Sequence, residues 1–356
     1  MIDQPVNVRQ GEELNQAVLA NYLREHVAGF KTIERIQQFP GGFSNLTYLV
    51  GTNLGEMVLR KPPHGANIKS AHDMQREYRV LERLKGIYGR IPPPIHFCAD
   101  ETIIGGQFYL MERVRGVILR SKPPKGFDTS PDYIRKVSEA AVDNLALLHQ
   151  INIHTTGLDV LGKPEGYVGR QVDGWIKRYQ KAQTDNIRVL DELATWMRAN
   201  QLPDGYPGLI HNDYKYDNLV LDEKEPVRIL AVLDWEMATV GDTRMDLGTS
   251  LAYWSEAKEA AQIPLAASNL TWLPGNLNRQ EVVERYCNTT GHDLPDPKFY
   301  FVYGAFKIAV IVQQIYARWK KGLTQDPRFE NLIHAVHYFG NLGRLAIDKD
   351  RISGLL

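Results

Sequence analysis

The chain has 356 residues, and its 42 Lys and Arg balance its 42 Asp and Glu, so the formal net charge is zero. A chain of this length can bury a large core and form two lobes, and its neutral charge gives no general attraction to nucleic acid or to an anionic membrane. The N-terminus has no apolar signal core, the most apolar run (308–312) is too short to span a bilayer, and Cys98 and Cys287 stand in no metal-ligand spacing, so we expect a soluble, cytoplasmic protein with two buried thiols.

The first hundred residues combine one helix with short strands. Apolar periodicity predicts a helix over 11–28, and alternating patterns predict strands over 32–39, 43–50 and 56–60. Between the first two strands lie two glycines with polar neighbours, which could bring hydrogen-bond donors close to phosphate oxygens: Gly41, Gly42, Ser44 and Asn45. A Gly-Gly pair between strands is also common in a plain hairpin turn.

Two basic residues end the third predicted strand, Arg60 and Lys61. Alternation along the strand favours Arg60 as a bidentate ligand for phosphate. A helix is expected to begin at Ser70, with Asp73 completing a capping box, and Glu77 falls on the apolar face of that helix. A carboxylate among apolar neighbours needs a partner, unless it lies at the solvated edge of the face.

Two more strands are predicted over 95–99 and 107–114, and from residue 130 the chain becomes mainly helical. The predicted helices are 130–149, one that carries Trp175 and Tyr179, 186–199, 247–254 with Asp246 as its cap, 279–288, 298–320 and 326–347. The irregular segment 262–278 holds Trp272, and an insertion of this kind in a helical lobe is expected to shape a substrate pocket.

The polar residues of 209–248 have a regular spacing. His211, Asp213 and Asn218 are followed by a predicted hairpin with strands at 219–221 and 227–233, and that hairpin runs directly into Asp234. Carboxylate and amide oxygens converging on one spot suit Mg²⁺. A further carboxylate there can orient a hydroxyl for attack on a phosphate.

The expected register of this hairpin places its two ends together. If Asp222 lies opposite Val227, then Asn218 lies opposite Ala231 and the residue after 233 falls beside 213–215.

The spacing H-x-D-x-x-x-x-N followed by L-D-W-E resembles the aminoglycoside phosphotransferase family, and the resemblance extends over roughly residues 30 to 320. It implies a bilobal α+β, protein-kinase-like fold. A small antiparallel-sheet N-terminal lobe (1–113) would bind the nucleotide, and a larger, mainly helical lobe (114–356) would hold the catalytic loop, the metal site and the substrate pocket. It also implies ATP and Mg²⁺ as cofactors, and transfer of a phosphoryl group to a hydroxyl.

The resemblance implies a role for each candidate residue. Asp213 would be catalytic and His211 would brace its loop, while Asn218 and Asp234 would hold Mg²⁺. The remaining candidates would bind the nucleotide: Gly41, Gly42, Ser44 and Asn45 over the triphosphate, Arg60 (or Lys61) paired with Glu77 at the phosphates, and Met111, Glu112 and Val114 at the adenine. An edge strand followed by a turn would give the same sequence at 111–114, and Asp246 is implied to help hold the catalytic loop.

Two other classes of protein remain as alternatives. A non-catalytic kinase-fold protein that binds nucleotide would be favoured by an incomplete set of acids and amides, and this set is complete. A protein kinase is disfavoured because the chain has no D-F-G or A-P-E element. We therefore expect a small-molecule hydroxyl compound as the partner, with the oligomeric state left open.

Within the family, LRKPP (59–63) and SAHDMQREYRVLERL (70–84) are most similar to the kinase-like domains fused ahead of acyl-CoA dehydrogenases. That similarity implies a hydroxylated acyl group as acceptor. An aminoglycoside is the alternative, and a polycation of this kind would require a markedly acidic pocket. Residues 235–300 hold nine Asp or Glu against six Lys, Arg or His, which is only a mild excess.

Overall fold

The structure is a computed structural model that describes residues 4–40, 45–63, 73–225, 227–263, 265–324 and 326–356. The described chain divides into two compact units. The first contains residues 1–118 and 218–238, and the second contains 119–217 and 239–356. The lobe boundary expected after residue 113 stays a prediction.

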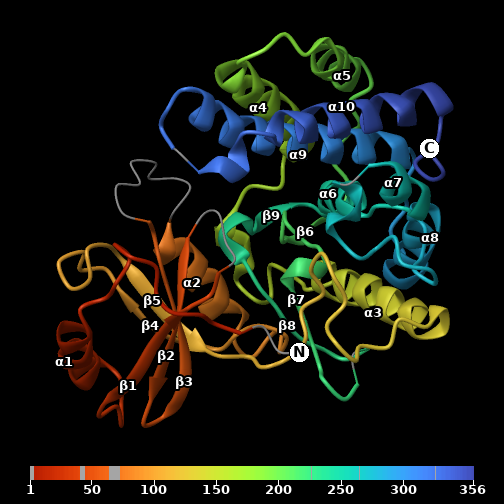
Figure 1. Ribbon diagram of the computed structural model, residues 1–356. Helices are drawn as coiled ribbons and strands as arrows, with labels where there is room; N and C mark the ends of the chain where they lie inside the picture. Colours follow the sequence, from red (N-terminus) through yellow and green to blue (C-terminus); the bar gives the residue numbers. More distant parts are fainter. Residues whose placement is uncertain (1–3, 41–44, 64–72, 226, 264, 325) are drawn as a thin grey trace. The chain divides into compact units, whose positions relative to one another are not determined.

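A five-stranded antiparallel sheet forms the centre of the first unit (Figure 1). Its strands follow the order β1-β2-β3-β5-β4. Their bounds are β1 Ile33–Gln38, β2 Leu46–Thr52, β3 Gly55–Lys61, β5 Phe108–Glu112 and β4 Pro94–Cys98. All five strands lie where the sequence predicted strands.

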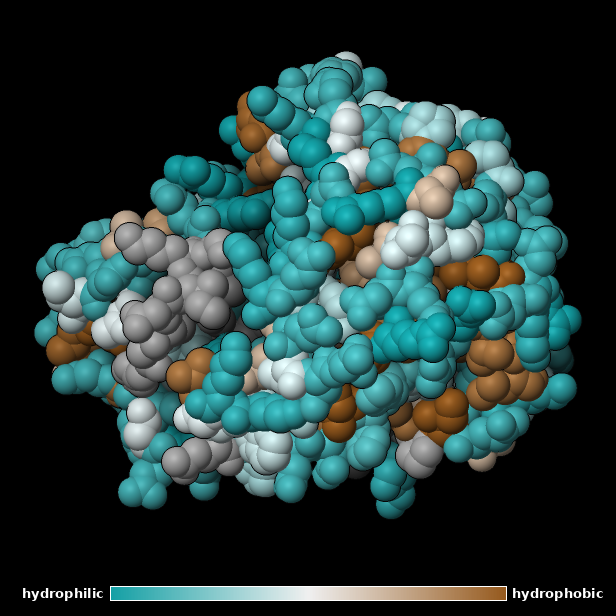
Figure 2. All heavy atoms as spheres, turned by 90° about the horizontal axis from the view of Figure 1, so that it is seen from above, coloured by the Kyte–Doolittle hydropathy of each residue, from teal (hydrophilic) through white to brown (hydrophobic). Residues whose placement is uncertain are grey.

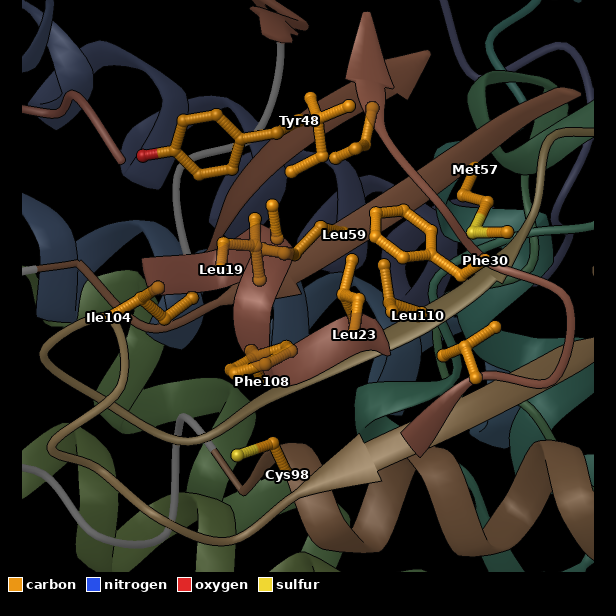
Figure 3. Close-up of a cluster of buried hydrophobic side chains, with 14 of the residues drawn as sticks. Leu19, Leu23, Phe30, Tyr48, Met57, Leu59, Cys98, Ile104, Phe108 and Leu110 are labelled. Carbon is orange, nitrogen blue, oxygen red and sulfur yellow. The ribbon is translucent and has the colours of Figure 1, made fainter. Parts of the chain in front are cut away.

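Alternation along these strands gives the sheet two faces with different partners. Leu59 and Phe108 share a buried cluster with Leu19 and Leu23 of helix α1 (Gln16–His26) (Figure 3). Tyr109 follows Phe108 and therefore points to the opposite face, where its ring lies 6.2 Å from Tyr78 of helix α2 (Met74–Leu84). Arg60, which follows Leu59, is placed on this second face with α2.

The N-terminus of α2 differs from the prediction. Asp73 is the N-cap, and its carboxylate accepts a 2.9 Å hydrogen bond from the backbone N of Arg76. The predicted cap, Ser70, lies outside the described residues. The helix begins at Met74 because the Asp73 side chain satisfies a backbone donor that has no partner within the helix.

The hairpin of β7 (Leu219–Leu221) and β8 (Ile229–Val232) is present, but its predicted register is wrong. Asn218 lies opposite Leu233, whose backbone N donates to the Asn218 carbonyl at 2.8 Å, and not opposite Ala231. A bulge between Val220 and Leu221 shifts the pairing. The turn is also longer than expected, because the Asp222 carboxylate accepts hydrogen bonds from the backbone N atoms of residues 224 and 225.

The second unit is mainly helical, and helix α9 packs against α4, α5, α6 and α10 (Figure 1). Its helices are α3 Pro131–His149, α4 Tyr167–Ala182, α5 Arg188–Ala199, α6 Thr243–Tyr253, α7 Ala257–Gln262, α8 Arg279–Thr290, α9 Pro297–Lys320 and α10 Leu332–Lys349. Strand β6 (Pro207–Ile210) pairs with β9 (Thr239–Asp242). Neither this strand pair nor α7 was predicted, because four to six residues are too few to show a clear period.

Within the part of the chain that the structure describes, α9 is the one helix long and apolar enough to cross a membrane by length and composition. Its most apolar window is 78% buried inside the protein, as in a core helix. The two cysteines are free thiols; Cys98 is buried as expected, whereas Cys287 is only partly buried. The face drawn in Figure 2 is mostly hydrophilic, with small separated apolar patches.

Candidate active site

In the first unit, one buried cation meets three carboxylates. The guanidinium of Arg60 pairs with Glu77 of α2, and its Nη2 lies 3.3 Å from Asp234 Oδ1 and 3.7 Å from Glu236 Oε2. The side-chain amide of Asn45 donates to Glu236 at 2.7 Å. This Arg60 cluster therefore carries more negative than positive charge when its acids are ionised.

The geometry separates the two basic residues at the end of β3. Lys61 is fully buried, and its ammonium donates to the carbonyl oxygen of Ile104 at 2.7 Å. Adjacent strand residues point to opposite faces, so Lys61 cannot share the position of Arg60. The predicted pairing of Arg60 with Glu77 is present, and the phosphate contact of Arg60 stays a prediction.

Glu77 connects three elements of the first unit. Its carboxylate binds Arg60 on β3 and accepts a 3.2 Å hydrogen bond from the backbone N of Trp235, the residue after Asp234. Burial raises the pKa of Glu77 to about 7, although the positive charge of Arg60 acts to lower it. Burial also acts to lower the pKa of Arg60, but the nearby carboxylates outweigh it and raise that pKa above its ordinary value.

Asp234 and Asn218, the expected metal ligands, are joined through the β7–β8 hairpin. Leu233, which precedes Asp234, donates its backbone N to the Asn218 carbonyl. Asp234 has φ of 67°, a left-handed conformation that is uncommon for residues other than glycine, and its side chain is 34% exposed. Such backbone strain persists where the surrounding contacts enforce it.

The donor atoms of this region fit Mg²⁺. They are an amide oxygen and carboxylate oxygens, and the surplus negative charge of the Arg60 cluster suits a divalent cation. Among the described residues there is no group of three or more His, Cys, Asp and Glu side chains that could hold a metal. Mg²⁺ does not need such a group, because it is usually bound by one or two carboxylates together with substrate phosphates and water.

In the second unit, Asp246 anchors the loop that follows β6. Its two carboxylate oxygens accept hydrogen bonds from the backbone N atoms of His211 and Asn212, both at 2.7 Å, and His149 Nε2 lies 3.0 Å away. Burial acts to raise the pKa of Asp246, but the hydrogen bond from His149, together with the nearby His211 and Lys307, holds it below its ordinary value. The prediction that Asp246 caps α6 is wrong: Asp242 is the cap, and Asp246 lies in the first turn, where it can reach the loop.

Asp213 is held as an anion in this loop. Lys215 Nζ donates to both of its carboxylate oxygens, at 3.0 and 2.9 Å. Burial acts to raise the pKa of Asp213, but Lys215, with His211 and Tyr253, outweighs burial and holds the pKa below its ordinary value. The backbone N of Asp213 donates to His211 Nδ1 at 3.2 Å, the kind of bracing contact expected of His211.

The nucleotide-binding predictions have different outcomes. Gly41, Gly42 and Ser44 lie outside the described residues. At the end of β5, Met111 is buried and pairs with Val58, Glu112 is exposed, and Val114 is partly buried. The contact of 111–114 with adenine stays a prediction.

Three charged residues that contact the candidate residues of their own unit, or the chain neighbours of these, were missed from the sequence: Glu236 in the first unit, and Lys215 and Lys307 in the second. Lys215 stands two residues after Asp213, and Glu236 belongs to the D-W-E triplet, so both had a signal in the motif itself. Lys307 had a weaker signal, a lone cation within the apolar run of α9.

Comparisons with known proteins relate the chain to a family and to solved folds. The model of the phosphotransferase enzyme family matches residues 35–280. Acyl-CoA dehydrogenase family member 11 of Rattus norvegicus is 35% identical over 312 residues, which cover 85% of this chain and 39% of that protein. Acyl-CoA dehydrogenase family member 10 of Mus musculus is 32% identical over 314 residues, 87% of this chain and 29% of that protein. The chain thus spans about two fifths or less of the length of these curated relatives.

A solved structure with a similar fold is that of a "putative aminoglycoside phosphotransferase" from Ralstonia eutropha. It has a TM-score of 0.77 and 28% identity, over 95% of this chain and 99% of that one. Choline kinase from Cryptosporidium parvum has a TM-score of 0.60 at 13% identity, over 94% and 97% of the two chains, a likeness of fold alone. These matches confirm the expected bilobal α+β, protein-kinase-like fold, and the chain belongs to the phosphotransferase enzyme family.

Proposed function

We propose that this protein is an ATP-dependent kinase that transfers the γ-phosphoryl group to a hydroxyl of a small molecule. The Arg60 cluster is the observation that carries the proposal. A guanidinium can bind phosphate oxygens in a bidentate way, and the carboxylate charge that surrounds it favours a divalent cation. Phosphoryl transfer needs both groups, because its catalysis rests on positioning and on neutralising charge.

Asp213 has the properties required to orient the acceptor. Its carboxylate would accept a hydrogen bond from the acceptor hydroxyl and take the proton as the new oxygen–phosphorus bond forms. The bond between the γ-phosphorus and the bridging oxygen breaks, and ADP leaves. The low pKa of Asp213 suits an anion that orients the hydroxyl more than a strong base. Bound Mg²⁺ would neutralise phosphate charge, and Asn218 and Asp234 are the residues that would hold it.

For the acceptor we propose a hydroxylated acyl compound such as a hydroxyacyl thioester. Support comes from the relatives named acyl-CoA dehydrogenase family members, in which this chain matches one part of a longer protein. An aminoglycoside is the second candidate, and the description of the Ralstonia eutropha protein favours it. The mild acidic excess of residues 235–300 supports the acyl compound more than a polycation.

A screen of ATP consumption tests the proposal. The acceptors are hydroxyacyl thioesters, amino-alcohols, sugars and aminoglycosides, each with and without Mg²⁺, and the product is identified by mass spectrometry. We expect turnover with a hydroxyacyl thioester that requires Mg²⁺. Turnover with aminoglycosides and with no other acceptor would replace the hydroxyacyl compound by an aminoglycoside as the acceptor. Phosphorylation of a protein, with no turnover on any small hydroxyl compound, would overturn the proposal.

Asp213→Asn provides the matched inactive variant, because it keeps the size of the side chain and removes its charge. We expect kcat to fall by about 10²–10⁴-fold, while nucleotide affinity measured by calorimetry is little changed. Asp143→Asn on α3 is the control, since Asp143 forms a surface ion pair with Arg285. If Asp213→Asn keeps most of its turnover, Asp213 has no part in the transfer.

A further inference from the structure

Lys307 is a buried cation on α9 that the proposed reaction does not use. Its side chain is nearly inaccessible to solvent, and its ammonium donates to three oxygen atoms. Two of them belong to Asn212, the backbone carbonyl at 2.8 Å and the side-chain Oδ1 at 2.9 Å, and the third is Thr249 Oγ1 at 3.4 Å. Three N–H groups thus meet three neutral acceptors, so the ammonium is fully hydrogen-bonded.

Asn212 is held from two sides in an uncommon conformation. Its φ is 68°, which places it in the left-handed region. Its backbone N donates to Asp246, while its carbonyl and its side chain accept from Lys307. A left-handed residue other than glycine costs free energy, least for Asn and Asp, and persists where contacts enforce it. Since Asp213 is the next residue, the backbone angles of Asn212 set the direction of the Asp213 side chain.

We propose that Lys307 is a positioning residue for Asp213: its ammonium holds Asn212 in the left-handed conformation and thereby aims the Asp213 carboxylate at the acceptor hydroxyl. The proposal rests on the proposed function and deepens it. Lys307 lies 95 residues after Asn212 in sequence, so a residue of α9 would help to set the geometry of the transfer.

Several charged groups face Lys307 from the elements around it. Asp246 lies on α6, Asp213 and Lys215 lie on the loop, and Arg178 lies on α4, whose Trp175 ring is 5.9 Å from the ammonium. Burial is the largest influence, and it lowers the pKa of Lys307 to about 8 although the two aspartates act to raise it. Above that pH the neutral amine keeps two N–H groups for three acceptors and loses its charge, so its grip on Asn212 weakens.

The same loss of a proton from Lys307 also changes the stability of the protein. High pH weakens the contact with Asn212 but raises the free energy of unfolding. The folded pKa lies below the ordinary lysine value, so between pH 8 and about 10.5 the unfolded chain binds more protons than the folded one. The contribution of Lys307 to the free energy of unfolding therefore rises with pH across this window. A purely structural Lys307 would show this rise alone, whereas a positioning residue also lowers kcat over the same range.

The experiment compares wild type with Lys307→Met and with Gln313→Leu, its matched control. Gln313 is also buried on α9, and its amide donates to Ala182 O at 2.9 Å and to Thr184 Oγ1 at 2.8 Å, away from the loop. We expect Lys307→Met to lower kcat on the order of 10²-fold with little change in KM for ATP. The alkaline fall in wild-type kcat near pH 8 should be absent from Lys307→Met and present in Gln313→Leu.

Two further measurements keep the test decisive. Lys307→Gln keeps two N–H donors without the charge, so it is used in place of Lys307→Met if that variant does not fold. It should also lack the fall in kcat near pH 8. Hydrogen exchange of peptides covering 209–217 does not depend on turnover. Exchange should be faster in Lys307→Met than in Gln313→Leu, whether or not an acceptor is found. If no acceptor is found but exchange still differs in this way, only the proposed function fails. Unchanged kcat in Lys307→Met, or equal exchange in the two variants, would overturn the positioning role.

Discussion

At the scale of single residues, the two candidate aspartates, one in each unit, have different partners. Asp213 is hydrogen-bonded through both oxygens to Lys215, whereas Asp234 lies 3.3 Å from Arg60 and has a partly exposed carboxylate. A carboxylate bound to one ammonium is suited to orient a neutral hydroxyl. An accessible carboxylate in a cluster with surplus negative charge is suited to a metal ion.

Asp234→Asn therefore tests the metal role at this scale. The amide keeps one oxygen ligand but loses the negative charge, so nucleotide binding should lose most of its dependence on Mg²⁺. Isothermal calorimetry with and without Mg²⁺ measures this dependence, with Asp222→Asn in the exposed β7–β8 turn as the control. A Mg²⁺ effect of the same size in Asp234→Asn and wild type would remove Asp234 from the metal site.

At the scale of secondary-structure elements, β3 and α2 are joined by a buried ion pair. Arg60 on β3 has two further carboxylates nearby, so it has partners left when Glu77 is removed. Removal of Arg60, by contrast, leaves carboxylates without their cation. Removing Arg60 should therefore cost more stability than removing Glu77, because an uncompensated buried charge is costly.

A double-mutant cycle of Arg60→Ala and Glu77→Ala measures this connection. We expect Arg60→Ala to lower the free energy of unfolding by about 3–5 kcal/mol, and Glu77→Ala to lower it by less. The coupling energy should lie at roughly 0.5–3 kcal/mol. Chemical denaturation of the four proteins gives these values, and a coupling energy near zero would show that Glu77 does not hold Arg60.

The α6–α9 contact depends on two glycines. A Cβ at Gly304 of α9 would overlap the carbonyl oxygen of Gly248 on α6, and a Cβ at Gly248 would overlap the carbonyl oxygen of Tyr300. Both neighbours are backbone atoms, so the helices themselves would have to separate. The close approach matters for the site because α6 carries Asp246 and α9 carries Lys307.

Gly304→Ala should lower the free energy of unfolding by about 1–3 kcal/mol or more, because the new methyl group meets backbone that cannot rotate away. Thermal unfolding measures the effect. Gly89→Ala is the matched control, since apart from its own chain neighbours nothing lies within 4 Å of its Cβ position, and it should be neutral or slightly stabilising. Equal melting temperatures for the two variants would contradict the close contact between α6 and α9.

At the scale of the whole molecule, the first unit contains two separate stretches of chain. Residues 218–238 belong to it, although they follow the 99 residues of 119–217, which belong to the second unit. Val117 and Leu221 exchange backbone hydrogen bonds at 2.8 Å, and the backbone N of Val232 donates to Arg90 O at 2.8 Å. Trp235, which is 1% exposed, packs edge-on against Tyr88.

A fragment of residues 1–118 should therefore lack a cooperative unfolding transition, because it loses the returning hairpin and the buried Trp235, the latter worth about 3–5 kcal/mol. Joining 218–238 to this fragment through a flexible Gly/Ser linker should restore the transition. Circular dichroism during heating compares the two proteins. A sharp transition in the 1–118 fragment alone would show that the hairpin is not part of this folding unit.

The sequence by itself determined the secondary structure of the sheet and most of the helices, and it supplied the candidates for the main site residues. Strand alternation and helix periodicity are local properties, and the motif spacing at 211–234 lies within 24 residues. The choice of Arg60 over Lys61 was also available from alternation, because one step along a strand reverses the face.

Only the tertiary structure decided the hairpin register, the role of Asp246 and the presence of Lys307 beside the catalytic loop. The register depended on a bulge that no local pattern reveals. Asp246 could have capped a helix as well as anchored a loop, and the choice between them was made by backbone N–H groups 34 and 35 residues away. Lys307 is the one charged residue in the stretch 299–317 of α9. Its three acceptors come from the loop and from α6, so only the packing of these elements explains why a buried ammonium is tolerated there.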